Sequence, residues 1–383
     1  MSTSSEHHSK HSHRKTRRSR IVIAGGGTGG HIFPAIAIAN AIKALDNNAK
    51  ILFIGAKGKM EMEKVPQAGF EIKGITIAGF NRSSLIKNLL LPFKLIISFF
   101  EVINIFKEFR PKVVVGVGGY STFPVLKYAQ SKGIPTFIHE SNSFAGKSNV
   151  LLGKNATKIF VATEGMDKFF PKEKIVITGN PVRDNIKNKT ITKSDALTSF
   201  GLKEGKTTVL IIGGSLGAKS INEAFATAIE KIEKADLQLI WQTGKTNKYK
   251  YKEVAKHINS ISVNEFIHDM ENAYAAADIV ISRAGAMAVT ELCVVGKPAI
   301  VVPYPFAAED HQTANAMVLV EKEAALLIKD SEVNEKLVDA VIALSKDEAL
   351  QQKLKTNIGA LAIRNADEVI AREILAAVHS SSH

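Results

Sequence analysis

Two glycine-rich segments are the first candidates for chemistry, because each follows a run of β-branched residues and precedes a helical pattern. The first, Gly25-Gly-Gly-Thr-Gly-Gly-His31, ends in a histidine, and the second is Gly213-Gly-Ser-Leu-Gly217. Glycines in such a turn let several backbone N–H groups approach a ligand at a helix N-terminus, where negative charge is favoured. Both segments therefore predict a site for an anionic ligand.

The first segment also contains the spacing G-x-G-x-x-G, at Gly25, Gly27 and Gly30, that nicotinamide dinucleotide sites use. Such a site needs an acidic residue where the second strand closes, and here that strand closes with Ile54-Gly-Ala-Lys57. We therefore reject the dinucleotide interpretation. His31 is either a structural cap of a helix that Pro34 is expected to start, or a base beside an anion-binding loop, since imidazole exchanges protons near neutral pH.

The second segment continues as Ala218-Lys-Ser220 and imitates a P-loop. The P-loop pattern requires glycine directly before the Lys-Ser pair, where this chain has Ala218, and no convincing Walker-B partner follows. We therefore reject an ATPase. The backbone N–H groups of this turn and the Ser215 hydroxyl are expected to hold a diphosphate.

Polar residues on two later segments are candidates for binding a sugar nucleotide. Glu291 lies among apolar residues of a helical pattern, so it is expected to accept specific hydroxyl donors, such as a ribose diol, rather than face solvent. A proline-rich loop that begins at Pro303 ends in four polar residues. These candidates for the sugar are Asp310, His311, Gln312 and Asn315, although Asp310 or Thr313 would also serve as a helix N-cap.

The elements that must position these residues alternate between short apolar runs and helical patterns. Such alternation predicts parallel sheets with helices on both faces. The series restarts after a polar stretch at 184–201, so we expect two doubly wound, Rossmann-like domains with a cleft between them. The expected strands are 20–24, 50–54, 112–116, 136–139, 158–162, 174–178, 207–212, 237–241, 261–263, 279–282 and 298–302, and the clearest expected helices are 34–45 and 222–234.

Composition limits the class of partner. The 383 residues carry a net charge of +13, and the first twenty are a basic, histidine-rich tail that we expect to be disordered. Basic charge suggests an acidic partner, but no nucleic-acid-binding module is recognised. The single cysteine, Cys293, is expected to be a buried core thiol. No D-x-D and no Cys/His pair at ligand spacing occurs, so we expect no metal site.

The segment 82–112 combines basic residues with phenylalanines. A core helix is one interpretation, and a surface that lies on anionic lipid is the other. No run of eighteen apolar residues occurs, so we expect no membrane-spanning helix.

Seven motifs in one order resemble the lipid I N-acetylglucosaminyltransferase family of peptidoglycan synthesis, which has the GT-B architecture. The resemblance runs from about Ile21 to the C-terminal helices. The motifs are Gly26-Gly-Thr-Gly-Gly-His31, Gly116-Val-Gly-Gly-Tyr-Ser121, His139-Glu-Ser-Asn142, Gly179-Asn-Pro-Val-Arg183, Gly213-Gly-Ser-Leu-Gly217, 284–291 and Asp310-His-Gln-Thr-Ala-Asn315.

The resemblance implies an inverting, metal-independent transfer of GlcNAc from UDP-GlcNAc to the C4 hydroxyl of MurNAc in lipid I, giving lipid II and UDP, with no cofactor. It makes His31 the candidate base. It implies acceptor contacts at Gly27, Gly30, Tyr120 and Ser121. It implies that Arg183 and Ser215 contact the diphosphate of the donor, Ile267 the uracil, and Glu291 the ribose. His311 and Gln312 would contact the GlcNAc, and the remaining donor contacts would be Thr28, Gly29 and Asn142.

The resemblance also implies a peripheral protein at the cytoplasmic face of the bacterial inner membrane. Its partners would be UDP-GlcNAc, lipid I, an anionic membrane surface and other cell-wall synthesis proteins, with no nucleic acid. The implied membrane contacts are Leu85, Lys87, Phe93, Lys94 and Phe99. The expected domains are a tail at 1–20, an acceptor and membrane domain at 21–184 that the last helix (about 357–378) rejoins, and a UDP-GlcNAc domain at 185–356.

Three other functions stay open on the sequence alone. Another GT-B enzyme, such as a diacylglycerol glycosyltransferase, would share both glycine-rich turns. A non-hydrolysing UDP-GlcNAc epimerase would need no acceptor and no basic apolar surface. A non-enzymatic membrane-recruiting subunit would usually hold only one half of this architecture.

Overall fold

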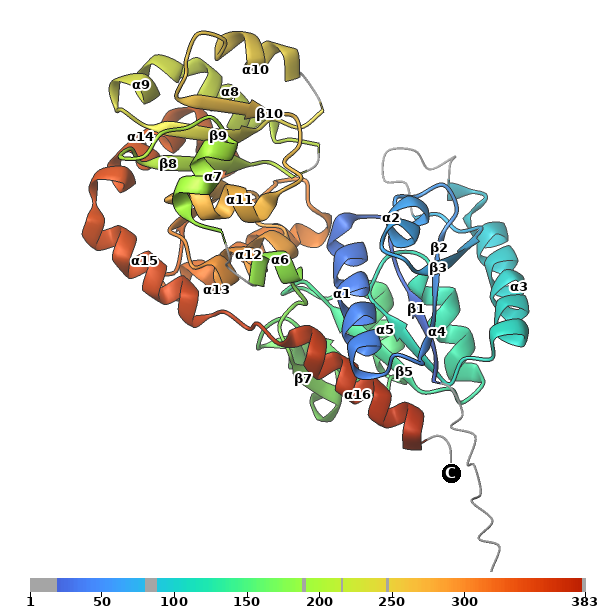
Figure 1. Cartoon of the computed structure of the whole chain (residues 1–383). Coiled ribbons are helices and arrows are strands. Elements are labelled where there is room, and N and C mark those ends of the chain that lie inside the picture. Colours follow the sequence, from blue (N-terminus) through green and yellow to red (C-terminus); the bar gives the residue numbers. More distant parts are fainter. Residues whose placement is uncertain (1–18, 80–87, 188–190, 215, 246–247, 381–383) are drawn as a thin grey trace, which may run out of the picture.

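A computed structural model describes residues 19–79, 88–187, 191–214, 216–245 and 248–380. It has two parallel β-sheets, one in each of two Rossmann-like domains, which confirms the predicted α/β class (Figure 1). The first sheet has the strand order β3-β2-β1-β4-β5-β6-β7, so the order reverses between β1 and β4. Its strands are β1 Arg20–Ala24, β2 Lys50–Ala56, β3 Glu71–Ile75, β4 Val113–Gly116, β5 Thr136–Glu140, β6 Lys158–Val161 and β7 Ile175–Ile177.

The second sheet repeats this plan with the order β10-β9-β8-β11-β12-β13, which reverses between β8 and β11. In open sheets of this kind, ligands bind beyond the carboxyl ends of the strands at the point of reversal. Both glycine-rich turns follow the strand at such a point. The strands are β8 Thr208–Ile212, β9 Gln238–Gln242, β10 Ile261–Asn264, β11 Ile279–Ser282, β12 Ala299–Val301 and β13 Leu326–Leu327.

Helices cover both faces of each sheet (Figure 1). Those of the first domain are α1 Gly29–Leu45, α2 Glu61–Gln67, α3 Leu91–Phe109, α4 Thr122–Ser131, α5 Lys147–Gly153 and two 3₁₀ turns, Met166–Lys168 and Lys172–Lys174. After α6 Asp184–Lys187 and α7 Lys193–Ser199, the second domain has α8 Lys219–Thr227, α9 Ile229–Lys234, α10 Lys248–Val254, α11 Met270–Ala276, α12 Ala286–Val295, α13 His311–Val320, α14 Val333–Lys346, α15 Glu348–Ala360 and 3₁₀ turns Ala308–Asp310 and Asp330–Glu332.

The last helix, α16 (Ala366–Ser380), returns to the first domain and packs along α1 (Figure 1). Its buried Ile370, Ile374 and Val378 share one apolar core with Ile38 and Ile42 of α1. Two segments of the chain therefore join the domains, one before α6 and one after α15. They meet where a Cβ on Gly179 would lie 2.8 Å from the Cβ of Ile363.

Three sequence predictions need correction. The first helix begins at Gly29, not Pro34, so His31 lies in its first turn; proline is tolerated inside because it forfeits only the bond to the Gly30 carbonyl. The helix expected at 222–234 is interrupted at Ala228. The tail does not extend to residue 20: Arg20 is in β1, and the buried Ser19 donates to Asp46 Oδ2 at 2.7 Å. Residues 1–18 lie outside the described part of the chain.

Candidate active site

His31 lies in the first turn of α1, shortly after the chain leaves β1 of the first sheet. Its Nδ1 is 3.2 Å from the Gly26 carbonyl oxygen and 3.4 Å from Thr28 Oγ1. Because a carbonyl oxygen only accepts, we assign the proton to Nδ1, which leaves the lone pair on Nε2. The ring fits beside Gly118 because that residue has no side chain: a Cβ there would lie 2.7 Å from Nε2. This geometry is compatible with a role as a proton acceptor through Nε2.

The surroundings of His31 keep its imidazole neutral. Burial is the largest influence and lowers its pKa, and His311 on the other domain lowers it further. The negative charges of Glu140 and Glu61 and the Gly26 carbonyl act in the opposite direction. A neutral imidazole at neutral pH can take a proton from a hydroxyl group.

A third glycine turn, after β4, lies directly against the first. The Gly26 N–H donates to the Gly118 carbonyl at 3.2 Å, and a Cβ on Gly119 would lie 2.3 Å from the Gly26 carbonyl oxygen. Tyr120 is half exposed, and Ser121 is buried at the start of α4 with its Oγ unpaired among the described residues. The structure thus brings the expected acceptor residues Gly27, Gly30, Tyr120 and Ser121 to one edge of the first sheet.

On the opposite side, Glu291 of α12 is buried and has two side-chain partners. Arg183 Nη2 lies 3.1 Å from its Oε1, and the Tyr274 hydroxyl donates to its Oε2 at 3.0 Å. Burial raises the pKa of Glu291, while Arg183 and Tyr274 oppose that shift. Arg183 also stacks on the Phe33 ring of α1, 5.4 Å from its centroid. Because it contacts both Phe33 and Glu291, Arg183 links the two domains. The expected role of Arg183 in binding the diphosphate did not include the contact with Glu291.

Other expected donor residues already have hydrogen-bond partners within the protein. The Ile267 N–H donates to Gln242 Oε1 at 3.0 Å, so a uracil would have to meet the Ile267 carbonyl. Gln312 Oε1 accepts the Tyr304 N–H at 3.0 Å, and His311 Nδ1 lies 2.6 Å from the Ala308 carbonyl oxygen. Both side chains thus fix the loop before α13. Thr28 is exposed and Gly29 half-buried at the start of α1, and Ser215 lies outside the described residues.

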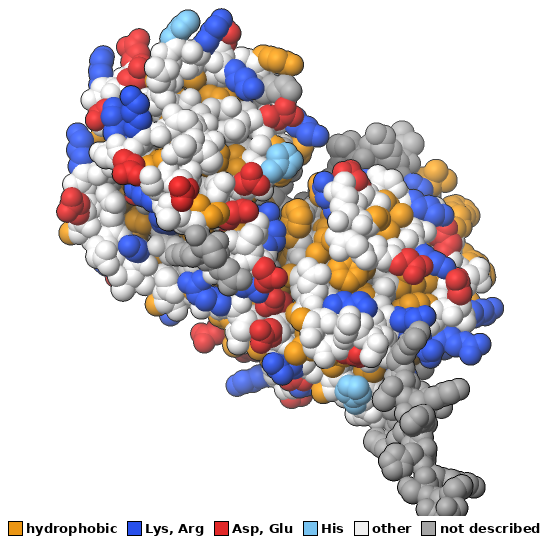
Figure 2. Space-filling model, viewed as in Figure 1, with side chains coloured by type: hydrophobic (Ala, Val, Ile, Leu, Met, Phe, Trp, Pro, Cys, Tyr) orange, Lys and Arg blue, Asp and Glu red, His pale blue; other side chains and the backbone are white. Residues whose placement is uncertain are grey.

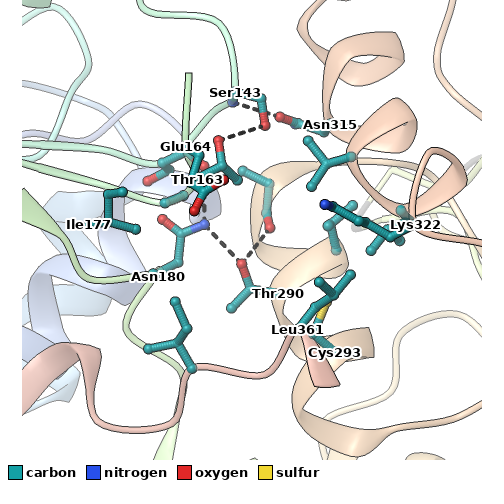
Figure 3. Close-up of a pocket in the computed structure, with 18 of the residues that line it drawn as sticks. Ser143, Thr163, Glu164, Ile177, Asn180, Thr290, Cys293, Asn315, Lys322 and Leu361 are labelled. Atoms are coloured by element: carbon teal, nitrogen blue, oxygen red, sulfur yellow. Dashed lines mark hydrogen bonds between the residues drawn. The ribbon is translucent and has the colours of Figure 1, made fainter. Parts of the chain in front are cut away.

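Hydrogen bonds between amides and hydroxyls join the two domains below this cleft (Figure 3). Asn315 accepts the Ser143 N–H at 2.9 Å and donates to Asn142 Oδ1 at 3.3 Å. Asn180 donates to the Ser141 carbonyl at 3.0 Å and to Thr290 Oγ1 at 2.9 Å. Asn142 therefore lies at the domain junction, where its amide helps to set the distance between the two sheets.

A pocket of about 670 Å³ adjoins this junction and is lined by both domains. Asn180, Thr290 and Asn315 point toward it in Figure 3, with Lys322 and Cys293 on the side of the second domain. Cys293 is buried as expected, and burial raises the pKa of its thiol to about 12. That thiol is unreactive at neutral pH.

Helix α3 carries an apolar stripe on its outer face. Phe93 is 64% exposed and Phe100 is 64% exposed, whereas Lys94 and Phe99 are half-buried, and Leu85 and Lys87 lie outside the described residues. The opposite face of α3 packs into the first domain through Val102, Ile105 and Phe106. We define the α3 patch as the exposed residues Leu89, Leu90, Phe93, Ile96, Ile97 and Phe100. Hydrophobic and basic side chains gather on this edge in Figure 2.

Neither a spanning helix nor a metal cluster is found in the described residues. No helix there is long and apolar enough to cross a membrane. In the same ranges, no three His, Cys, Asp or Glu side chains are grouped closely enough to hold a metal ion.

Sequence reasoning missed several residues that shape the site. Glu61 and Tyr274 are buried beside the two halves of the cleft, yet each lies in an ordinary helical pattern of charged or small residues. Glu140 was noted only within a motif, although its carboxylate accepts from Asn142, Gly146 and Asn149. The position of Glu140 at the end of β5 was the available signal, because side chains at strand ends face the cleft.

Comparisons with known proteins agree over nearly the whole chain. The glycosyltransferase family 28 N-terminal domain matches residues 21–161, and the C-terminal domain of that family matches residues 208–372. A Phocaeicola vulgatus protein named UDP-N-acetylglucosamine--N-acetylmuramyl-(pentapeptide) pyrophosphoryl-undecaprenol N-acetylglucosamine transferase is 50% identical over 358 residues, covering 93% of this chain and 95% of its own length.

Two further relatives extend the comparison. A Bacteroides thetaiotaomicron protein with the same name is 50% identical over 363 residues, covering 93% of this chain and 97% of its own length. The crystal structure of Acinetobacter baumannii MurG is 28% identical, covers 94% of this chain and 99% of that chain, and superposes with a TM-score of 0.75.

Proposed function

This chain belongs to glycosyltransferase family 28, and on that premise we propose that it transfers GlcNAc from UDP-GlcNAc to the C4 hydroxyl of MurNAc in lipid I. The products are lipid II and UDP, and the reaction belongs to peptidoglycan synthesis. One observation carries the chemistry: a neutral histidine base at the glycine turn of the first domain lies close enough to the second domain for His311 to lower its pKa. The names of the relatives supply the identity of the two sugars.

The proposed reaction is a single displacement that inverts the anomeric centre. His31 Nε2 removes the proton from the C4 hydroxyl while its oxygen forms a bond to the anomeric carbon. The bond from that carbon to the UDP oxygen breaks at the same time, and the electron pair leaves with UDP. Negative charge then grows on the diphosphate, where the second glycine turn and the N-terminus of α8 stabilise it.

Donor recognition is assigned to the second domain. Glu291 accepts the ribose hydroxyls, which requires Arg183 to turn from the carboxylate toward the diphosphate when the donor binds. Gln312 and His311 read the GlcNAc hydroxyls from the start of α13. The junction formed by Asn142 and Asn315 keeps the two domains close enough to exclude water, which protects UDP-GlcNAc from hydrolysis.

The α3 patch supports a peripheral position on an anionic membrane, at the cytoplasmic face where lipid I would be met. Four exposed apolar side chains on α3 and two in the turn before it are more than solubility favours, and such a face inserts into the headgroup region of a bilayer. Contacts with other cell-wall synthesis proteins belong to the same proposal, and nucleic acid does not.

The test measures UDP release from UDP-GlcNAc with and without a short-chain lipid I analogue, in buffer without added metal. We expect acceptor-dependent release together with a disaccharide-lipid product. Conversion of UDP-GlcNAc without any acceptor would instead identify an epimerase. Release that needs an acceptor other than lipid I would identify a different transferase.

A further inference from the structure

Glu61 is a buried carboxylate that the proposed reaction does not use directly. It is 1% exposed and occupies the first position of α2, so the positive end of that helix favours its charge. Its Oε1 accepts the Ala56 N–H at 2.9 Å, and its Oε2 accepts the Gly27 N–H at 2.8 Å. One carboxylate therefore joins the end of β2 to the glycine turn that carries His31.

The turn is shaped around this side chain. Gly26 and Gly27 have φ angles of +148° and +89°, and a Cβ on Gly26 would lie 2.3 Å from Glu61 Cδ. Gly55 of β2 is constrained in the same way, because its Cβ would lie 2.4 Å from Glu61 Cγ. The carboxylate thus fills the space that side chains at both positions would need.

The second glycine turn shows that a buried carboxylate is not required to build such a turn. There, the neutral Gln242 side chain donates to the Gly214 carbonyl at 3.0 Å. Gly217 packs on the backbone of Thr243, where a Cβ would lie 2.0 Å from the carbonyl oxygen. A neutral amide and backbone contacts suffice in that case, so the costly burial of a charge at the first turn calls for another reason.

That reason is the position of the catalytic base, and here the inference rests on the proposed transfer reaction. We propose that Glu61 is a positioning residue: by holding the Gly27 N–H, it fixes the neighbouring Gly26 carbonyl and, through it, the ring of His31. The Gly26 carbonyl binds Nδ1 of that ring at 3.2 Å, so a displacement of Gly26 rotates Nε2 away from the acceptor hydroxyl. Misplacement of a reacting group by about 1 Å can cost about a hundredfold in rate.

The charge of Glu61 has a second, smaller effect on the same base. The groups that face His31 are Glu140 and His139 from β5, His311 from α13 and Glu61 from α2. Glu140 raises the pKa of His31 more than Glu61 does. Loss of the Glu61 charge should therefore lower the pKa of His31 modestly, an effect that a change in fold stability alone would not produce.

Three variants of the full chain test the proposal. Glu61→Gln keeps the shape of the side chain but has only one acceptor oxygen, whereas the N–H groups of Ala56 and Gly27 both need an acceptor. Glu61→Asp keeps the charge but is too short to reach both groups. Glu63→Gln, on the exposed side of the same helix, is the matched control. The readouts are kcat and KM with the short-chain lipid I analogue, the pH profile of kcat/KM, UDP affinity by calorimetry and the midpoint of thermal unfolding.

We expect Glu61→Gln to lower kcat ten- to a hundredfold and to move the acidic limb of the profile to lower pH, with UDP affinity unchanged. Glu61→Asp should lower kcat but leave the acidic limb in place. Wild-type kcat and profile in Glu61→Gln would overturn the proposal. If that variant does not fold, wild-type kcat in a folded Glu61→Asp would overturn it.

A failure of the proposed function is recognised separately, because the wild-type protein itself would then show no acceptor-dependent release. In that case, NMR titration of the His31 ring, assigned with His31→Gln, decides the matter in the wild type and Glu61→Gln. We expect a lower pKa and altered Nδ1 shift in the variant. Identical titrations would show that Glu61 does not position the histidine.

Discussion

The two glycine-rich turns follow the same plan, yet a carboxylate contacts the first and a neutral amide contacts the second. The first turn has the Glu61 carboxylate bound to its Gly27 N–H at 2.8 Å. The Gly214 carbonyl of the second turn accepts from the neutral Gln242 amide at 3.0 Å. Arg283, which is paired with Asp330 at 2.6 Å, contacts Ser220 of α8 just after that turn at 3.0 Å. The repeated motif thus supplies similar backbone, and the side chains around it set the charge.

This difference separates the two halves of the proposed reaction. A carboxylate behind a turn disfavours a phosphate there and stabilises the imidazolium that forms when a neighbouring histidine takes a proton. A guanidinium, although balanced here by Asp330, favours a diphosphate on which charge grows. The spacing of the glycines indicates where a ligand approaches the backbone. The buried charge near each turn indicates which kind of ligand approaches.

Removal of the base gives the largest expected effect on this comparison. In His31→Ala, we expect kcat to fall by about a thousandfold, because the group proposed to accept the hydroxyl proton is removed. UDP affinity should stay near the wild-type value, since the second turn and Glu291 lie on the other domain. Steady-state kinetics with the short-chain acceptor and calorimetry with UDP check both statements.

His311→Ala is the matched control, because it removes a histidine from the opposite side of the same cleft. It should affect donor KM more than kcat. Wild-type turnover in a folded His31→Ala protein would remove His31 from the mechanism and return the first turn to a structural role.

The two domains should also respond differently to acid. His139 of β5 is fully buried, and its pKa is lowered to about 4, chiefly by burial. A histidine whose pKa is lower in the folded state contributes stability that is complete above its unfolded pKa near 6.5 and is lost as pH falls through 4. The loss amounts to about 3 kcal/mol over that window. Burial raises the pKa of Glu291 in the second domain, so protonation there acts in the opposite direction.

Chemical unfolding of His139→Gln and the wild type at pH 7, 5.5 and 4 measures this contribution. The free energy of unfolding should fall less steeply with acid in the variant than in the wild type. His268→Gln changes an exposed histidine of the second domain and should reproduce the wild-type slope. Equal slopes in all three proteins would show that His139 is protonated without unfolding.

A smaller effect is expected at the donor carboxylate. In Glu291→Ala, we expect the KM for UDP-GlcNAc to rise roughly ten- to a hundredfold, because hydrogen bonds to a charged acceptor contribute about 1.5–3 kcal/mol. The change should leave the pH limb that reports His31 unaltered. Tyr274→Phe, which removes one partner of Glu291 without removing the carboxylate, should raise KM less. An unchanged KM in Glu291→Ala would contradict the ribose assignment.

The sequence predicted the class of fold because β-strand and helix patterns alternate along the chain and glycine-rich turns separate them. Each of these patterns depends only on residues that are close together in the sequence. It also predicted that Glu291 is buried, because Glu291 stands among apolar neighbours in the sequence. It could not predict that Arg183 binds Glu291 or that Glu61 binds Gly27. These pairs lie 108 and 34 residues apart, and only the tertiary fold brings the members of each pair together.

Local signals also misplaced some boundaries for identifiable reasons. Proline favours the first turn of a helix and so predicts a start at Pro34, but Gly29 and Gly30 before it adopt helical backbone as well. Of the two phenylalanines expected on the membrane surface, Phe93 is exposed, whereas Phe99 is half-buried. A segment of apolar residues on nearly every position does not reveal which face meets the core.

The α3 patch distinguishes the first domain from the second at the surface and gives the smallest expected effect. In a Phe93→Ser/Phe100→Ser variant, binding to vesicles of anionic lipid should weaken about tenfold, because the two rings together contribute roughly 1.4 kcal/mol when partly buried in the headgroup region. Tyr249→Ser removes a side chain that is 77% exposed on α10 of the second domain, and it should bind vesicles as the wild type does. Vesicle sedimentation at low and high salt separates the two contributions, since salt weakens the attraction of basic residues but not apolar insertion. If the double variant and the wild type bound equally at both salt concentrations, the α3 patch would not be the membrane contact. The two domains would then differ only in the side chains of the cleft.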